Sequence, residues 1–285
     1  MKLVVLEGPR IGVLRDGVPV DVTAAFADIP YRTAADWMPR VIAALPERRA
    51  QAEALAASGA PVADARLLAP IPRPPKLIAC FANYREGRSG ERLAQDMFLE
   101  SPDSVIGPGG TVRLPNHPTD VVHHEAELAL VIGSRVKDLP ADERAFAALA
   151  GYTAGIDVSA RGIGRMGPSR IGKSFDTFTP LGPCIVTPDE ISDPHNLQLT
   201  LTVNGVVATD FNTNDMEYNI PEILAYATSY MTLVPGDVIL TGTNHIGMGP
   251  IQHGDVVELT IEQIGVLRVN VEDPLGRAWP RPSAA

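Results

Sequence analysis

The residues best suited to chemistry lie in one stretch, 123–133, which reads His-His-Glu-Ala-Glu-Leu-Ala-Leu-Val-Ile-Gly. As a β-strand with a period of two, it places Glu125 and Glu127 on one face, and its other face carries Ala126, Leu128, Leu130 and Ile132. Two adjacent carboxylates repel each other unless they share a proton or a cation lies between them, and a hard divalent cation is the simplest remedy. The alternative is a strand whose glutamate face is solvated. The stretch alone leaves both interpretations open.

The composition narrows the class of protein. The chain has 285 residues, 45% of them hydrophobic, which is enough for the sizeable core of a globular protein. Its formal net charge of −10 argues against nucleic acid or an anionic membrane as a partner, because both require basic patches. The sequence shows no apolar run of membrane-spanning length and no signal-peptide pattern, so we expect a cytoplasmic protein. Cys80 and Cys184 lack metal-ligand spacing and are expected to be buried thiols.

The elements that must position the glutamates are predicted to form two domains. Residues 1–69 are expected to be a small N-terminal α+β domain, and the proline-rich residues 70–75 a stiff linker. A catalytic domain at 76–275 and a tail at 276–285 complete the division. Within the small domain we predict strands at 3–6, 11–15 and 18–22, an Asp16-Gly17 hairpin turn, and two alanine-rich helices at 33–44 and 46–57.

The larger domain has mainly strand-like patterns, so the expected fold class is α+β, mainly β. Helices are predicted at 141–150 and 221–230, each with proline near its start. An Asn204-Gly205 turn between apolar runs predicts a hairpin over 197–211. The Gly- and Pro-rich residues 172–183 are expected to be an ordered loop outside regular structure. Further strands are predicted at 77–82, 111–114, 153–156, 238–241, 256–261 and 266–271.

Four motifs follow one another in the larger domain: Glu-Ala-Glu at 125–127, Asp-Val-Ser-Ala-Arg at 157–161, Lys-Ser-Phe-Asp-Thr-Phe at 173–178, and Pro-Gly-Asp-Val-Ile at 235–239 with Thr-Gly-Thr at 241–243. In this order and at these spacings they resemble the fumarylacetoacetate hydrolase family from about residue 76 to residue 271. The resemblance implies a mixed β-sandwich roll as catalytic domain, a small N-terminal domain and a homodimer. It also favours a cation at the glutamates over a solvated face.

The resemblance further implies that Glu125, Glu127 and Asp157 hold Mg²⁺ or Mn²⁺. Three carboxylates suit a hard cation that keeps several waters and leaves positions for a bidentate substrate. A 2-oxo acid or 1,3-dicarbonyl acid chelates such a cation, which as a Lewis acid would stabilise the enolate formed when a C–C bond breaks or a proton moves. Taken alone, Asp157 also fits a cap or a turn.

The resemblance assigns roles to four more residues. Lys173 matches the family lysine whose ammonium would hold a substrate carboxylate or enolate oxygen. The sequence has only four lysines, which argues against an ordinary surface lysine. Thr243 resembles the family threonine that binds the substrate carboxylate, and it fits a simple turn equally well. Tyr84 and Arg85, in and beside the family's Asn-Tyr pair, are also expected to bind substrate; a surface charge or an ion pair is the alternative for Arg85.

The chain departs from the family at the group that activates water. Family hydrolases often carry a histidine shortly after Asn-Tyr and a glutamate three residues later, but Gly87 and Gly90 stand at these positions. His123, on the glutamate face, and His245, in the glycine-rich loop 242–249, are candidate bases. The alternative role for His123 is a hydrogen bond to a metal ligand, and the alternative role for His245 is a contact that stabilises its loop. Other groups that could reach the site are Glu86, Glu91 and Glu100, the last at a position where the family usually has lysine.

The sequence therefore predicts a Mg²⁺-dependent enzyme acting on a small oxoacid. The leading hypothesis is C–C bond hydrolysis of an acylpyruvate-like or fumarylacetoacetate-like 1,3-diketo acid. Decarboxylation, hydration or keto–enol tautomerisation comes second, because these reactions ask mainly for enolate stabilisation and the family dyad is missing. A non-catalytic oxoacid-binding protein is the third. Substrate selectivity is expected to lie in residues 87–98 and in the loop around His245.

Overall fold

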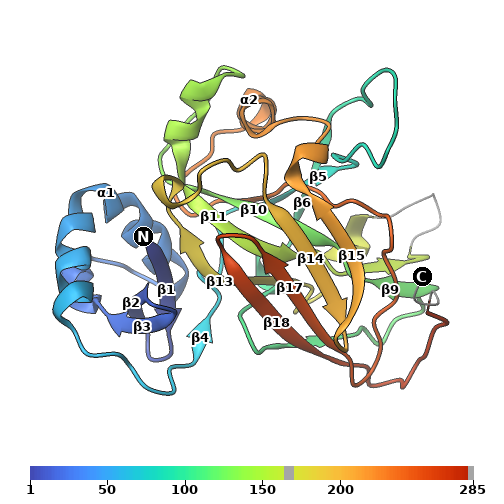
Figure 1. Cartoon of the computed structure of the whole chain (residues 1–285), viewed down its shortest axis with the longest axis horizontal. Coiled ribbons are helices and arrows are strands. Elements are labelled where there is room, and N and C mark those ends of the chain that lie inside the picture. Colours follow the sequence, from blue (N-terminus) through green and yellow to red (C-terminus); the bar gives the residue numbers. More distant parts are fainter. Residues whose placement is uncertain (164–169, 282–285) are drawn as a thin grey trace.

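A large mixed β-sheet forms the centre of the molecule (Figure 1). The computed structural model describes residues 1–163 and 170–281. The sheet has 11 strands in the order β3-β2-β1-β13-β11-β10-β16-β5-β6, with β4 paired to β1 and β7 paired to β13. Its strands are β1 (Lys2–Leu6), β2 (Arg10–Arg15), β3 (Val18–Asp21), β4 (Leu67–Leu68), β5 (Leu77–Phe81), β6 (Asp96–Glu100), β7 (Val105–Ile106), β10 (Ala126–Ile132), β11 (Leu149–Ile156), β13 (Thr179–Val186) and β16 (Val238–Leu240).

A second sheet of five strands runs in the order β15-β14-β17-β18-β8, and β12 and β9 form a separate pair. One buried cluster contains apolar side chains of both large sheets, including Leu128 and Leu130 from the first and Leu199 and Leu259 from the second. The fold is therefore α+β and mainly β, as predicted. The strands outside the first sheet are β8 (Thr111–Arg113), β9 (Val121–His123), β12 (Ser159–Arg161), β14 (Gln198–Val203), β15 (Val206–Asn212), β17 (Val256–Ile261) and β18 (Gly265–Glu272).

The N-terminal module contains one long helix, α1 (Ala34–Ser58), so the prediction of two helices is wrong. A capping box between Thr33 and Asp36 starts α1, and Pro39 and Pro46 both lie inside it. Proline interrupts helical hydrogen bonding, but here a continuous apolar stripe outweighs that local preference. The buried side chains of the stripe are Trp37, Met38, Val41, Ile42, Leu45, Ala52 and Ala56.

The second helix, α2 (Ile220–Tyr230), confirms the prediction for 221–230, with Asn219 and Glu222 forming a capping box. The helix predicted at 141–150 is wrong: residues Glu143–Ala148 form the 3₁₀ helix η3, and β11 starts at Leu149 because it pairs with β10 from that point. The other 3₁₀ helices are η1 (Thr23–Phe26), η2 (Pro102–Ser104), η4 (Arg170–Lys173), η5 (Pro188–Glu190) and η6 (Thr213–Asp215). Within the described residues no helix has the length and apolarity needed to cross a bilayer.

The expected loop 172–183 is wrong in its second half, because β13 begins at Thr179 and contains Pro180 and Pro183. This strand pairs with β1, β11 and β7, so its neighbours impose the extended backbone despite the prolines. Its pairing with β1 also joins the N-terminal strands to the large sheet, at the left of Figure 1.

The glutamate stretch is not one continuous strand. β9 ends at His123 and β10 begins at Ala126, so residues 124 and 125 interrupt the alternation. Every residue of β10 is buried: one face packs in the core shared with the second sheet, and the other, with Ala129 and Val131, packs in the core under α1. A solvated glutamate face is therefore excluded.

Several other predictions are confirmed. The Asn204-Gly205 hairpin is formed by β14 and β15, and the predicted strands around it lie within two residues of β5, β8, β16, β17 and β18. Cys80 and Cys184 are buried free thiols. Of the expected tail, residues 282–285 lie outside the described residues.

Candidate metal centre

Three carboxylates meet where β10 and β11 lie side by side. The antiparallel register pairs Ala126 with Ile156, and the Asp157 N–H donates to the Glu125 carbonyl oxygen at 2.9 Å. Asp157 therefore follows β11 directly opposite Glu125, which precedes β10. One oxygen from each of Glu125, Glu127 and Asp157 lies within 4.8 Å of the others, and the three residues are 5%, 1% and 1% exposed.

Two cations contact this cluster. Lys173 Nζ donates to Glu125 Oε2 at 2.6 Å and also to Asp157, and the Arg161 guanidinium donates to the other oxygen of Glu125. Arg161 ends β12, whereas Lys173 ends η4, so both reach the cluster from segments that follow Asp157 in sequence. Arg161 stands in the 157–161 motif, but the sequence pattern alone assigns it no role.

The charges make the three carboxylates unequal. Burial raises the pKa of Glu127 well above its usual range, and the neighbouring Asp157 adds to the effect. Burial also raises the pKa of Asp157, to about 6, although Lys173 opposes the shift. Burial alone would raise the pKa of Glu125 too, but Lys173 and Arg161 outweigh it and lower this pKa to about 2. Glu125 is therefore the most firmly ionised of the three.

The donor set fits a hard divalent cation. Asp157 Oδ1 is buried and has no hydrogen-bond partner among the described residues, which is costly unless something else contacts it. Glu127 Oε2 accepts the Gly242 N–H at 2.5 Å, which fixes the orientation of this carboxylate. Three carboxylate oxygens within one small space are ligands that Mg²⁺ or Mn²⁺ prefers. Glu125, Glu127 and Asp157 would hold the metal.

The Thr-Gly-Thr turn after β16 lies against the cluster. Thr241 N–H donates to the Leu128 carbonyl at 3.0 Å, and its hydroxyl donates to the same oxygen at 2.9 Å. The turn is thus held beside β10, and the Gly242 N–H donates to Glu127. Thr243 is buried directly after it, with its hydroxyl donating to the Asn244 carbonyl at 3.4 Å.

Tyr84 and Arg85 have structural partners. Tyr84 is buried, with its ring edge-on to Phe211 at 5.0 Å between centroids. Burial raises its pKa, and the hydroxyl has no hydrogen-bond partner among the described residues. Arg85 Nε lies 3.6 Å from the buried carboxylate of Glu217, and this ion pair is the expected alternative to substrate binding.

The two candidate bases lie in different surroundings. His123 ends β9 opposite Ser159, and its Nδ1 is buried without a partner among the described residues. Burial lowers the pKa of His123, and the positive charge of Arg161 lowers it further. His245 is more exposed and its Nδ1 lies 2.5 Å from Glu86 Oε1. Glu100 is a further buried carboxylate, and its Oε1 lacks a partner within the described part of the chain. Burial raises the pKa of Glu100, and the negative charge of Asp157 raises it further.

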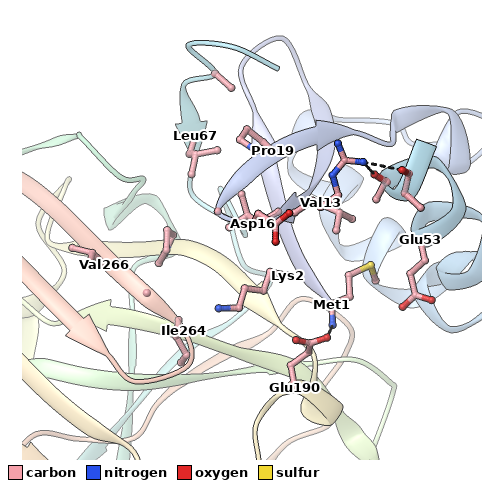
Figure 2. Close-up of a pocket in the computed structure, with 18 residues that line it drawn as sticks. Met1, Lys2, Val13, Asp16, Pro19, Glu53, Leu67, Glu190, Ile264 and Val266 are labelled. Atoms are coloured by element: carbon pink, nitrogen blue, oxygen red, sulfur yellow. Dashed lines mark hydrogen bonds and ion pairs between the residues drawn. The ribbon is translucent and has the colours of Figure 1, made fainter. Parts of the chain in front are cut away.

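Two hollows differ in their relation to this cluster. A cavity of about 300 Å³ opens beside Lys173 and Arg161, and its walls include Phe81, Phe98 and Arg170. A groove of about 900 Å³ lies between the N-terminal strands and residues 264–266, and Figure 2 shows Lys2 pointing into it. None of the predicted site residues lines the groove. The cavity beside Lys173 is therefore the one of these two hollows that adjoins the carboxylate cluster.

Comparison with known proteins identifies the family of enzymes to which this chain belongs. The family model described as fumarylacetoacetate (FAA) hydrolase C-terminal matches residues 53–272, and the chain belongs to the fumarylacetoacetate hydrolase family. It is 35% identical over 291 residues to a maleylpyruvate hydrolase of Aquipseudomonas alcaligenes, covering 95% of this chain and 99% of that protein. It is also 37% identical over 279 residues to a mitochondrial oxaloacetate tautomerase of Bos taurus, covering 92% and 87%.

A solved structure agrees with the fold. The structure of maleylpyruvate hydrolase from Sphingobium sp. SYK-6, in complex with manganese(II) ion and pyruvate, superposes with a TM-score of 0.85. The two proteins are 35% identical, and the alignment covers 96% of this chain and 99% of that one.

Proposed function

We propose that this protein is a divalent-metal-dependent hydrolase that cleaves a C–C bond in a small 1,3-diketo acid of the acylpyruvate class. The observation that carries the proposal is the cluster of Glu125, Glu127 and Asp157, in which a buried Asp157 oxygen has no partner among the described residues. Relatives named maleylpyruvate hydrolase align over nearly the whole chain, and one was solved with manganese and pyruvate, which supports the same substrate class here.

The side chains around the cluster provide the binding and orientation that this reaction needs. When bound, Mg²⁺ or Mn²⁺ would polarise a carbonyl oxygen and stabilise developing negative charge on it. Lys173 presents its ammonium to the same space and would hold a substrate carboxylate or enolate oxygen. The side chains of Phe81 and Phe98 form an apolar part of the cavity wall. Thr243, Tyr84 and Arg85 stay proposed substrate contacts, and His123 stays the alternative to His245 as the base.

The test is product analysis. The Mg²⁺-loaded protein is incubated with a series of acylpyruvates and with oxaloacetate, while the enol absorbance is followed and the products are identified. Two acids formed from an acylpyruvate support hydrolysis, whereas loss of the enol signal without cleavage contradicts it. The variant Asp157→Ala is expected to lose both metal binding and activity. If it bound Mg²⁺ as well as the parent, the ligand assignment would be wrong.

Keto–enol tautomerisation of a 2-oxo dicarboxylate is the second candidate. The observation that favours it is the pair Gly87 and Gly90 where family hydrolases carry the water-activating dyad. The oxaloacetate tautomerase relative shows that tautomerase is one of the activities named in this family. Rapid interconversion of oxaloacetate enol and ketone, with no acid products from acylpyruvates, would select this candidate. The homodimer and the cytoplasmic location stay predictions.

A further inference from the structure

His245 and Glu86 form a pair across two loops that are 159 residues apart in sequence. The His245 Nδ1 lies 2.5 Å from Glu86 Oε1, and the His245 backbone N–H donates to the same oxygen at 3.0 Å. One carboxylate oxygen therefore fixes both the backbone and the ring. With Nδ1–H directed to a carboxylate, the lone pair of a neutral imidazole is on Nε2, and this is the arrangement of a base oriented by an acid.

A third residue holds the two loops together. Asp215 Oδ2 accepts the Glu86 N–H at 3.0 Å and the side-chain amide of Asn244, the neighbour of His245, at 2.8 Å. Glu86 has φ of +55° and Gly87 has φ of +75°, so this turn uses the left-handed region twice. Such backbone is unfavourable for glutamate and persists because its surroundings impose it. The turn that places Glu86 under His245 is also what favours glycine at 87, the position of the family histidine.

The loop that carries His245 borders the carboxylate cluster at both ends. Its first end places the Gly242 N–H on Glu127, and further along Met248 Sδ lies 3.8 Å from the Arg161 guanidinium that binds Glu125. The Gly249 N–H then donates to His124 Nε2 at 3.3 Å. His245 therefore stands between two segments of this loop that both contact the cluster or its partner Arg161.

We propose that His245 is the general base of this site and that Glu86 is its positioning residue, a dyad assembled from two loops in place of the family dyad missing at Gly87 and Gly90. The inference rests on the proposed function. In hydrolysis, His245 Nε2 takes a proton from water as the hydroxide oxygen bonds to the acyl carbonyl carbon. The C–C bond then breaks, its electron pair passes to the methylene carbon as pyruvate enolate, and the imidazolium returns the proton to that carbon. The new carboxylic acid loses its own proton to solvent.

The kinetic test compares His245→Gln, Glu86→Gln and Glu86→Asp with the parent, all loaded with Mg²⁺. His245→Gln should lower kcat by about 10²-fold or more, because a positioned general base contributes about 10²–10⁴-fold. Glu86→Gln should lower kcat at least about tenfold with little change in KM, and Glu86→Asp should restore part of it. The matched control is Glu47→Gln, an exposed glutamate of α1, with parental kinetics. Parental kcat in both His245→Gln and Glu86→Gln overturns the proposal.

A second readout needs neither metal nor turnover. A proton NMR spectrum of the metal-free protein should show a low-field His245 Nδ1–H signal that is present in Glu47→Gln and lost in Glu86→Gln, with the amide spectrum otherwise retained. A parent without this signal lacks the pair, which overturns the dyad. If the parent tautomerises oxoacids but never cleaves them, the proposed function fails separately. The same variants then decide whether His245 removes the substrate's α-proton, and parental kcat in Glu86→Gln again counts against the dyad.

Discussion

At the scale of single residues, two cationic side chains contact the carboxylate cluster, and they do not contact its three carboxylates equally. Lys173 contacts Glu125 and Asp157, and Arg161 contacts Glu125, while Glu127 receives only the Gly242 N–H among the polar contacts of the described residues. Burial then raises the pKa of Glu127 and Asp157, and both must lose their protons to bind a metal. Metal binding would therefore exchange protons of the cluster for the cation.

The exchange predicts how metal affinity depends on pH. The pKa of Asp157 is raised to about 6, so this carboxyl holds its proton to higher pH than a solvated aspartate does. The apparent affinity for Mn²⁺ should be highest above pH 7. It should fall by about tenfold per pH unit below pH 6, because each metal then displaces at least one proton. Calorimetry at pH 5 and pH 7.5, in buffers of different ionisation enthalpy, measures both affinity and proton release. Equal affinities at the two pH values would contradict the expectation.

Lys173 allows binding and catalysis to be separated. Lys173→Met removes a positive charge from beside the carboxylates, so Mn²⁺ affinity should stay the same or rise, because the cation that repels the metal is gone. Turnover should fall by about 10²–10³-fold, the usual effect of removing a group that stabilises developing negative charge. Lys173→Arg is the control that keeps the charge. Calorimetry and kcat are measured on the same samples, and parental turnover in Lys173→Met would show that the ammonium does not act on the substrate.

At the scale of elements, the site depends on how closely the turn after β16 approaches its neighbours. Gly242 has φ of +90°, and a Cβ built there would lie 3.1 Å from the Cβ of Asn83. Both features favour glycine, and the same backbone places the Gly242 N–H on Glu127. The turn is therefore part of the candidate metal centre as well as of the fold.

Gly242→Ala tests this coupling. We expect a loss of more than about 1 kcal/mol in the free energy of unfolding, because alanine is strained at positive φ, together with weaker Mn²⁺ binding. The control is Gly254→Ala, whose φ is +85° and whose added Cβ would meet open space. It measures the backbone cost alone and should leave metal binding unchanged. Chemical denaturation and Mn²⁺ titration compare the two, and equal effects on both measurements would mean that the close approach at Asn83 is unimportant.

Elements with strong local signals could be predicted from the sequence, whereas those imposed by distant neighbours could not. The Asn204-Gly205 hairpin and α2 follow from turn and capping residues inside the segment. By contrast, β13 contains two prolines and exists because β1, β11 and β7 pair with it. The prolines of α1 likewise suggested a break that tertiary burial of its apolar stripe overrides.

The same distinction applies to the site. Glu125, Glu127 and Asp157 could be predicted because they stand in motifs of fixed order, and the register of β10 with β11 brings them together. The contact of Glu86 with His245 could not be predicted, since two loops far apart in the chain produce it.

At the scale of the whole molecule, the N-terminal module is structurally continuous with the rest. β1 pairs with β13, so the large sheet runs from the module into the strands that carry the carboxylates. The core under α1 also includes side chains from the central strands, among them Ala129, Val131 and Leu240. The module therefore covers one face of the sheet whose other face packs against the second sheet.

Removing the module tests whether the catalytic strands can stand without it. A chain that starts at Lys76 would leave β13 with an unpaired edge and would expose the apolar face that includes Leu77, Leu181 and Val238. Burial of such residues stabilises a fold by about 25 cal/mol per Å² of apolar surface, so the loss over a whole sheet face exceeds the usual stability of a domain. We expect this chain to aggregate, or to bind a hydrophobic dye without a cooperative thermal transition, and to lose Mn²⁺ binding. The full chain with Arg73→Ala, which removes only a surface ion pair with Asp103, is the control and should melt like the parent. If the shortened chain melted cooperatively and bound Mn²⁺ with parental affinity, residues 76–275 would fold independently and the shared core would contribute little to the site.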